Sequence, residues 1–277
     1  ELLDVAEFTT TQLSAFQSTQ AAALTATSVS QLAATQIAAF GASQVGRLGT
    51  ETLQALDATQ MAALTTTQLR GVTSTQIDAL SAEDVAEMTT TQLAALSKTQ
   101  VTALTETNMT SLAATQVASF TTSQIQAFSA EEISALDGVQ AGALTATQLA
   151  ALNSTQVAGL NATDIAEFAA TQVAALGSAQ LSRLSDEALR AMDANQIGAL
   201  STTQVRALTA TQISALEAAD VAEFANTQLA ALNTTQMRAL TETNIVDLAE
   251  TQIAALANTQ VQALSTDILN ALSDSQF

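Results

Sequence analysis

Apolar and polar residues alternate along the whole chain with a period of eight residues. Segments such as Thr89–Leu96 (TTTQLAAL) and Thr145–Leu152 (TATQLAAL) have a polar first half and an apolar second half. We number the positions of this octad 1 to 8. Position 8 is Leu, Phe, Met or Val in all thirty-four complete octads. A fixed short period indicates an elongated array, in which each unit buries its apolar side against its neighbours.

Each octad carries the signals that begin a helix. Position 1 is usually Thr, Ser, Asp or Asn, and position 4 is Gln in twenty-four octads, counting the last, incomplete one. This spacing is that of a capping box, in which the two side chains satisfy each other's backbone N–H groups. The apolar residues at position 8 of one octad and position 5 of the next are spaced as a hydrophobic staple. The sequence therefore predicts a new helix every eight residues.

Neither a continuous helix nor a strand explains the pattern. Eight residues advance an α-helix by more than two full turns, so the apolar positions would drift around a continuous helix and form no lasting stripe. Side chains on one face of a strand recur every second residue, whereas positions 5 and 8 are three apart. The pattern instead predicts an all-α fold, made of short helices joined by sharp corners.

The glutamine at position 4 has two interpretations. The first is helix capping, as described above. The second is a hydrogen bond from its amide to a neighbouring turn of the array, which would connect successive turns.

Octads without this glutamine recur with a second period. We call them exceptional octads; their position 4 residues are Asp4, Ser28, Thr52, Asp84, Asn108, Glu132, Asp164, Ala188, Asp220, Asn244 and Ile268. They are separated by three or four octads, with a mean of 3.3, which is close to 3.4, and the threes and fours alternate as the spacings of apolar residues do along a helix. We therefore expect a superhelical solenoid with about 3.4 octads per turn, whose exceptional octads gather on one side.

A longer repeat supports this value. The segment Gly41–Met88 recurs as Gly177–Phe224, an offset of 136 residues. This offset is seventeen octads, or about five superhelical turns. We expect one continuous solenoid over residues 1–277, which is part of a longer array and has internal super-repeats at about 1–136 and 137–272.

Acidic residues concentrate in the exceptional octads. Positions 4 and 7 are neighbours on a helix surface, and four octads carry carboxylates at both: Asp4/Glu7, Asp84/Glu87, Asp164/Glu167 and Asp220/Glu223. Glu132 adds a further carboxylate at position 4. Arginines recur in a related phase at Arg47, Arg70, Arg183, Arg206 and Arg238.

Three interpretations of the acidic side remain open. It is a solvated face that keeps the array soluble, or a lateral interface in which Asp84, Glu87, Glu132, Asp164, Glu167, Asp220 and Glu223 meet the arginines above, or a Ca²⁺ site at the four carboxylate pairs. Ca²⁺ takes six to eight oxygen ligands, so a pair would need help from adjacent turns. No other cofactor is expected.

Composition narrows the function. The chain contains no Cys or His, which removes thiol nucleophiles, imidazole bases and the commonest zinc ligands. Its net charge of −19 repels phosphate backbones. Polar residues interrupt every octad, so no apolar run is long enough to cross a membrane. We therefore expect neither an enzyme, nor a nucleic-acid-binding protein, nor a transmembrane segment.

The octad also resembles a known kind of repeat. The phrase T-x-T-Q-[VIL]-x-A-[LF], seen at Thr89–Leu96, resembles the Thr-Gln octapeptide-repeat arrays of large bacterial secreted or cell-surface, adhesin-like proteins. The resemblance covers the whole chain and implies an extracellular location, but it carries over no functional residue.

Together these observations predict a structural role. We expect a repeat segment of an extracellular bacterial fibre, filament or surface layer, which associates with copies of itself in a homopolymer or bundle through the acidic residues and arginines. The alternative is an α-solenoid binding module or adhesin stalk whose acidic face recruits a basic partner or Ca²⁺.

Overall fold

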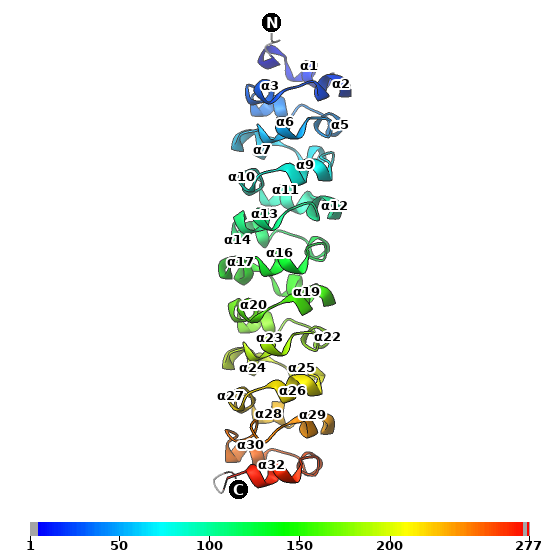
Figure 1. Cartoon of the computed structure of the whole chain (residues 1–277). Coiled ribbons are helices and arrows are strands. Elements are labelled where there is room, and N and C mark those ends of the chain that lie inside the picture. The colour runs from blue at the N-terminus through cyan, green and yellow to red at the C-terminus, as the bar shows by residue number, and fades with distance from the viewer. Residues whose placement is uncertain (1–4, 274–275, 277) are drawn as a thin grey trace. The chain divides into compact units, whose positions relative to one another are not determined.

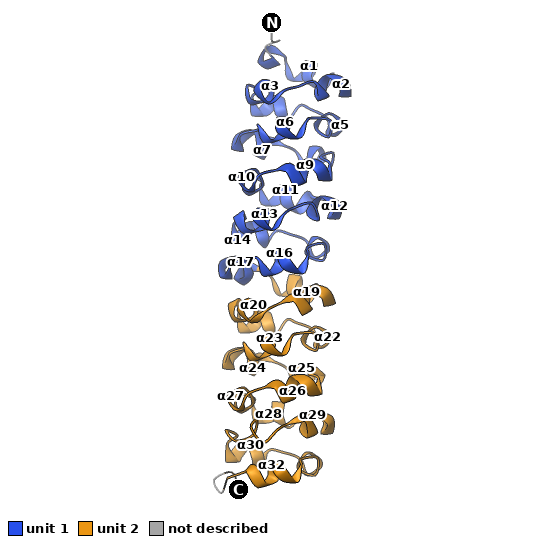
Figure 2. Cartoon of the chain, in the orientation of Figure 1, with its two compact units in different colours: residues 1–143 blue, residues 144–277 orange. Residues whose placement is uncertain are grey.

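The computed structural model describes residues 5–273 and 276. It divides into two compact units, residues 1–143 and residues 144–277 (Figure 2). The division falls close to the boundary between the two super-repeats expected from the sequence. The two units are built in the same way, and each is considered by itself below.

The first unit consists of short helices, one per octad (Figure 1). Their bounds are η1 Val5–Glu7, α1 Thr10–Ser14, α2 Ser18–Ala22, α3 Ala26–Ser30, α4 Ala34–Ile37, α5 Ala42–Val45, α6 Thr50–Gln54, α7 Ala58–Ala63, α8 Thr66–Leu69, α9 Ser74–Ala79, α10 Ala82–Ala86, α11 Thr90–Ala95, α12 Lys98–Val101, α13 Glu106–Ser111, α14 Ala114–Val117, α15 Thr122–Ile125, α16 Ala130–Ser134 and α17 Gly138–Ala143.

The second unit continues the series, except that residues 241–248 form turns instead of a helix. Its helices are α18 Ala146–Ala150, α19 Ser154–Gly159, α20 Ala162–Glu167, α21 Ala170–Val173, α22 Ser178–Leu181, α23 Asp186–Arg190, α24 Ala194–Ala199, α25 Thr202–Ala207, α26 Ala210–Ala215, α27 Ala218–Ala222, α28 Asn226–Leu229, α29 Thr234–Ala239, α30 Glu250–Ala254, α31 Asn258–Val261 and α32 Thr266–Ala271. The all-α prediction is confirmed, and no strand occurs among the residues that the structure describes.

The octad around α11 shows how each helix begins and ends. The Gln92 N–H donates to Thr89 Oγ1 at 3.2 Å, and the Thr89 N–H donates to Gln92 Oε1 at 2.7 Å. This is the predicted capping box. After α11, Leu96 and Ser97 both have extended backbone conformations, with ψ of 140° and 160°. Two extended residues therefore make the corner, and no described residue needs a positive φ.

The core of each unit consists of the apolar side chains at positions 5 and 8. In the octad of α11 these are Leu93 and Leu96, both buried. The corresponding residues of the second unit, Leu229 and Leu232, are buried in the same way. Helices of one to two turns are unstable in isolation, so this burial against neighbouring turns is what keeps them folded.

Helices three octads apart pack against one another. In the first unit α5 contacts α8, α11 contacts α14, and α10 contacts α13; in the second unit α20 contacts α23, and α26 contacts α29. Figure 1 shows the consequence within the first unit, where α3, α7, α10 and α14 follow one edge and α2, α5, α9 and α12 follow the other.

The position 4 glutamines connect each turn to the one before it. Gln92 Nε2 donates to the carbonyl oxygens of Met61 and Leu64, which lie 31 and 28 residues earlier, at 2.7 and 2.8 Å. Gln236 does the same to Val205 and Leu208 in the second unit. Both interpretations of the glutamine, capping and connection between turns, are therefore confirmed. Each helix thus packs against the helix three octads earlier, and its glutamine bonds to the end of the octad four earlier. Both contacts fit the expected superhelical turn of about 3.4 octads.

Candidate functional site

In the exceptional octads considered first, the side chain at position 4 is shorter than glutamine. Thr52 Oγ1 donates to the Leu24 carbonyl at 3.0 Å, and Asn108 Nδ2 donates to the Leu80 carbonyl at 3.2 Å. Both acceptors lie 28 residues earlier, as for glutamine, although Thr and Asn have shorter side chains. Successive turns must therefore approach more closely here, and a short side chain is what this side of the solenoid accommodates.

An ionised aspartate at position 4 can cap its helix but cannot donate a hydrogen bond to the preceding turn. Asp84 is buried, and its Oδ2 accepts the Ser81 N–H at 2.8 Å. Asp164 is also buried and accepts the Asn161 N–H at 2.8 Å. A carboxylate has no proton to donate to a carbonyl oxygen of the preceding turn. These two aspartates are thus capping residues within the core rather than surface groups.

A cluster of carboxylates forms around Glu87, in the first unit. Glu87 is half-buried at the end of α10. Burial raises its pKa, and the charges of Asp84, Glu83 and Asp57 raise it further. Asp57 lies in the preceding turn, at the N-cap of α7. The superhelix therefore brings together carboxylates that are 30 residues apart in the sequence.

The second unit repeats this cluster with an offset of 136 residues. Asp193, Asp220 and Glu223 correspond to Asp57, Asp84 and Glu87. Burial again raises the pKa of Glu223, followed by the charges of Asp220 and Asp193. The Glu223 Oε2 atom is buried and has no hydrogen-bond partner in the described part of the chain. The cluster of carboxylates therefore occurs in both super-repeats, although bringing these like charges together costs electrostatic energy.

The remaining predicted carboxylates have varied surroundings. Glu132 is half-buried, and this burial raises its pKa. Hydrogen bonds from Ser129 lower the pKa of Glu132 in part, and the charges of Glu131 and Glu106 raise it further. Glu167 is half-buried and Glu7 is exposed. Asp4 lies outside the described residues. These residues share the acidic side but do not form one uniform site.

The described residues contain no group of three or more Asp or Glu side chains arranged to hold a metal ion. In the pair Asp84/Glu87, one oxygen of Asp84 already accepts a backbone N–H. In the clusters around Glu87 and Glu223, the charges of the neighbouring carboxylates add to burial in raising the pKa of these two glutamates.

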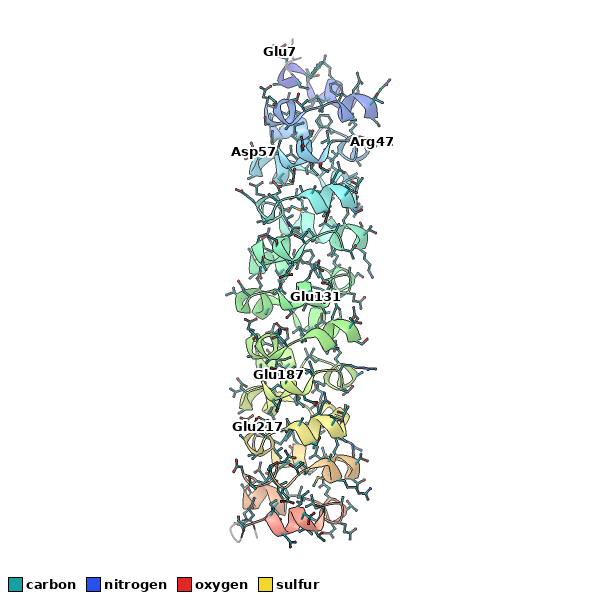
Figure 3. The ribbon with its side chains drawn as sticks, in the orientation of Figure 1. Glu7, Arg47, Asp57, Glu131, Glu187 and Glu217 are labelled. Atoms are coloured by element: carbon teal, nitrogen blue, oxygen red, sulfur yellow. The ribbon has the colours of Figure 1, made fainter. Side chains whose placement is uncertain are left out.

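The predicted arginines lie on a different side of each unit from the carboxylate clusters. Each of Arg47, Arg70, Arg183, Arg206 and Arg238 is two octads beyond an exceptional octad. Two octads are more than half of a turn of about 3.4 octads, so Arg70 and Arg206, which are also two octads before the next exceptional octad, lie roughly across the superhelix axis from the exceptional octads. Arg47, Arg183 and Arg238 are one octad before the next exceptional octad. Figure 3 shows Arg47 at one edge of the first unit and Asp57 at the opposite edge.

The arginine side chains are available for contacts with other molecules. All five are exposed. Within the part of the chain that the structure describes, none of the five forms a hydrogen bond or an ion pair through its side chain. Arg47 and Arg70 follow α5 and α8, which pack together, so their octads are neighbours on one side of the first unit.

The sequence pattern missed part of the acidic side. Asp57, Asp193 and Glu83 were not among the predicted site residues, and all three are exposed. The signal that could have found the first two is their position: each stands three octads before a carboxylate pair, at position 1, and they are 136 residues apart. We call the exposed and half-buried carboxylates of the exceptional octads, with Asp57 and Asp193, the acidic side, and the five arginines the arginine side.

Comparison with known proteins supports the repeat architecture. Residues 53–90, 173–210 and 187–218 match the ALTTAQ repeat family, and the first of these segments contains the phrase ALTTTQ at Ala63–Gln68. No curated protein matches the chain. Among the described residues, no helix has the length and apolar character needed to cross a membrane. The chain is therefore a repeat array, and its similarity to a family covers the three matched segments.

Proposed function

We propose that this chain is a structural segment of an extracellular bacterial fibre, filament or surface layer, and that it associates with copies of itself. Its octads set length and spacing, and its charged sides make the contacts. The acidic composition and the resemblance of the octad to surface-protein repeats support the location.

The observation that carries the proposal is the hydrogen bond from the buried position 4 glutamines to the turn before them. Gln68 donates to the carbonyls of Ile37 and Phe40, each at 2.8 Å, and Gln260 donates to those of Leu229 and Leu232 at 2.8 and 2.9 Å. Every such turn presents the same donors to one neighbour and the same acceptors to the other. A unit of this kind extends by adding turns, as the repeats of a stalk or fibre require.

Electron microscopy of the purified chain, with and without millimolar Ca²⁺, tests the proposal. We expect filaments, sheets or laterally paired particles that form without Ca²⁺. Isolated single particles at every protein concentration and ionic strength would contradict self-association.

The second candidate is a binding module whose acidic side recruits a basic partner. The gathering of Asp57, Asp84 and Glu83 around Glu87 favours it: after burial, their charges raise the pKa of Glu87, and a cation bound there would offset this repulsion. Titration with an oligolysine peptide distinguishes the two: saturable binding by a chain that stays monomeric supports the binding module, whereas self-association without peptide supports the structural segment.

A further inference from the structure

An open groove crosses three successive turns on the arginine side of the first unit. It has a volume of about 450 Å³ and runs over α8, α11 and α14, which contact one another in that order. Its lining residues are Thr66, Arg70, Thr90, Thr91, Ala94, Ala95 and Ser119.

The chemistry of this groove suits a carboxylate. Arg70 supplies a guanidinium with five N–H donors and no partner of its own in the described chain. Thr66, Thr90 and Thr91 add hydroxyl groups that can donate to the same anion. The small side chains of Ala94 and Ala95 leave space in the groove for the anion. An exposed arginine among hydroxyls binds carboxylates well because its planar donors match their two oxygens.

The second unit carries nearly the same residues 136 positions later. Arg206 corresponds to Arg70, Thr202 to Thr66, and Asn226 and Thr227 to Thr90 and Thr91. The charge and hydrogen-bonding capacity of the groove are thus part of the super-repeat, as the carboxylate clusters are. The basic and acidic elements recur with one common spacing along the chain.

The acidic side offers the complementary groups. Glu83 and Asp57 in the first unit, and Glu217 and Asp193 in the second, are exposed carboxylates. In Figure 3 Asp57 lies at one edge of the first unit and Arg47 at the other, so these two side chains do not face each other within the unit.

We propose that the arginine side of one copy of this chain binds the acidic side of a second copy, with carboxylates of the second copy entering the Arg70 groove and its Arg206 counterpart. This inference rests on the self-association proposed above and assigns its two surfaces. Because the surfaces are different and lie on different sides, the contact is heterologous: each bound copy leaves one unused surface of each kind. Such a contact adds further copies side by side instead of closing a dimer.

The net charge determines the salt dependence of this contact. Two chains of charge −19 repel each other over the Debye length, which is about 30 Å at 0.01 M salt, about 10 Å at 0.1 M and about 3 Å at 1 M. At the lowest ionic strength the repulsion between whole chains opposes association, and at the highest the contacting pairs are screened. We expect association to be strongest near 0.1 M.

Sedimentation velocity of three charge variants, each checked for unchanged helical circular dichroism, tests the assignment. The basic-side variant is Arg70→Glu with Arg206→Glu, and the acidic-side variant is Glu83→Lys with Glu217→Lys. We expect each alone to associate at least about tenfold more weakly than the natural chain, and an equimolar mixture of the two to recover association, because the reversed charges become complementary. The matched control, Arg190→Glu, changes an exposed arginine of an exceptional octad and is expected to leave association intact.

The outcomes separate this inference from the proposed function. A natural chain that sediments as a monomer under all conditions overturns both. A natural chain that associates, together with a basic-side variant that associates equally well, overturns the assignment of the surfaces while self-association stands. Recovery in the mixture supports the heterologous contact, since two independently disrupted chains would not restore each other.

Discussion

The side-chain amide of Gln92 donates a hydrogen bond to the carbonyl oxygen of Leu64, 28 residues earlier, at 2.8 Å. Its Oε1 accepts the N–H of Thr89 at the start of its own helix. One buried side chain therefore joins the N-terminus of a helix to the C-terminus of a helix in the preceding turn. Both ends of a short helix have unpaired backbone groups, and this bridge pairs the Thr89 N–H at one end with an acceptor and the Met61 and Leu64 carbonyls at the other with a donor.

Replacing Gln92 by Glu separates the two functions of this side chain. The carboxylate can still accept the Thr89 N–H, but it removes the amide donor to the carbonyls of Met61 and Leu64 and brings negative charge to them; the Met61 carbonyl keeps the Leu64 N–H. We expect a loss of about 2–4 kcal/mol in the free energy of unfolding, measured by urea denaturation. Gln12→Glu is the control, because Gln12 is exposed and, among the described residues, its side chain forms hydrogen bonds only with Thr9. Equal effects at both positions would show that the connection between turns contributes nothing.

Asp84→Asn should stabilise the protein. Asn108, at the equivalent position of another exceptional octad, accepts its N-cap N–H through Oδ1 and donates to Leu80 through Nδ2. An asparagine at position 84 can make both bonds, the second to the Leu56 carbonyl, and it removes a charge next to Glu87. We expect a gain of about 1 kcal/mol, by the same urea measurement. Glu51→Gln, an exposed change of equal charge in another exceptional octad, should have almost no effect. A destabilised Asp84→Asn chain would contradict this account of the exceptional octads.

Gly71 allows two backbones to approach closely. A Cβ atom on Gly71 would lie 2.2 Å from the carbonyl oxygen of Ala42, in the preceding turn. Because backbone cannot move aside as a flexible side chain can, Gly71→Ala should separate α8 from α5 and cost about 1–3 kcal/mol. Gly198→Ala is the control, since a Cβ there meets nothing within 4 Å, and in a helix the change should be neutral or stabilise by up to about 1 kcal/mol. Thermal unfolding of the two variants compares them, and a harmless Gly71→Ala would rule out the close approach.

The raised pKa values of Glu87 and Glu223 predict how stability depends on pH. A carboxyl group with a higher pKa in the folded state binds its proton more tightly there than in the unfolded chain. These two groups therefore stabilise the protein fully below the ordinary glutamate pKa of 4.5, and this stabilisation is lost as pH rises through the folded-state values. At pH 7 the Glu87→Gln/Glu223→Gln variant should melt at a higher temperature than the natural chain, and the difference should shrink as pH falls towards 4.5. A difference independent of pH would contradict the assignment.

The fold could be predicted from the sequence because its determinants are local. The capping box of Thr89 and Gln92 lies within one octad, and so does the spacing of Leu93 and Leu96 that makes both of them core residues. The recurrence of exceptional octads every three or four units was enough to predict the superhelical turn, since it reports which octads share a side.

Which residues meet across turns was decided only by the tertiary structure. The structure places Leu64 next to Gln92, Leu24 next to Thr52, and Asp57 beside Glu87. These contacts depend on the rotation and rise of the chain summed over several corners, and a single octad does not determine that total rotation and rise. The same accumulation buries Asp84 while its neighbour Glu83 stays exposed, and it separates the arginines from the carboxylates. The octad determined what each unit is; the geometry of a whole turn determined which of its polar groups face a carbonyl, another charge or the solvent.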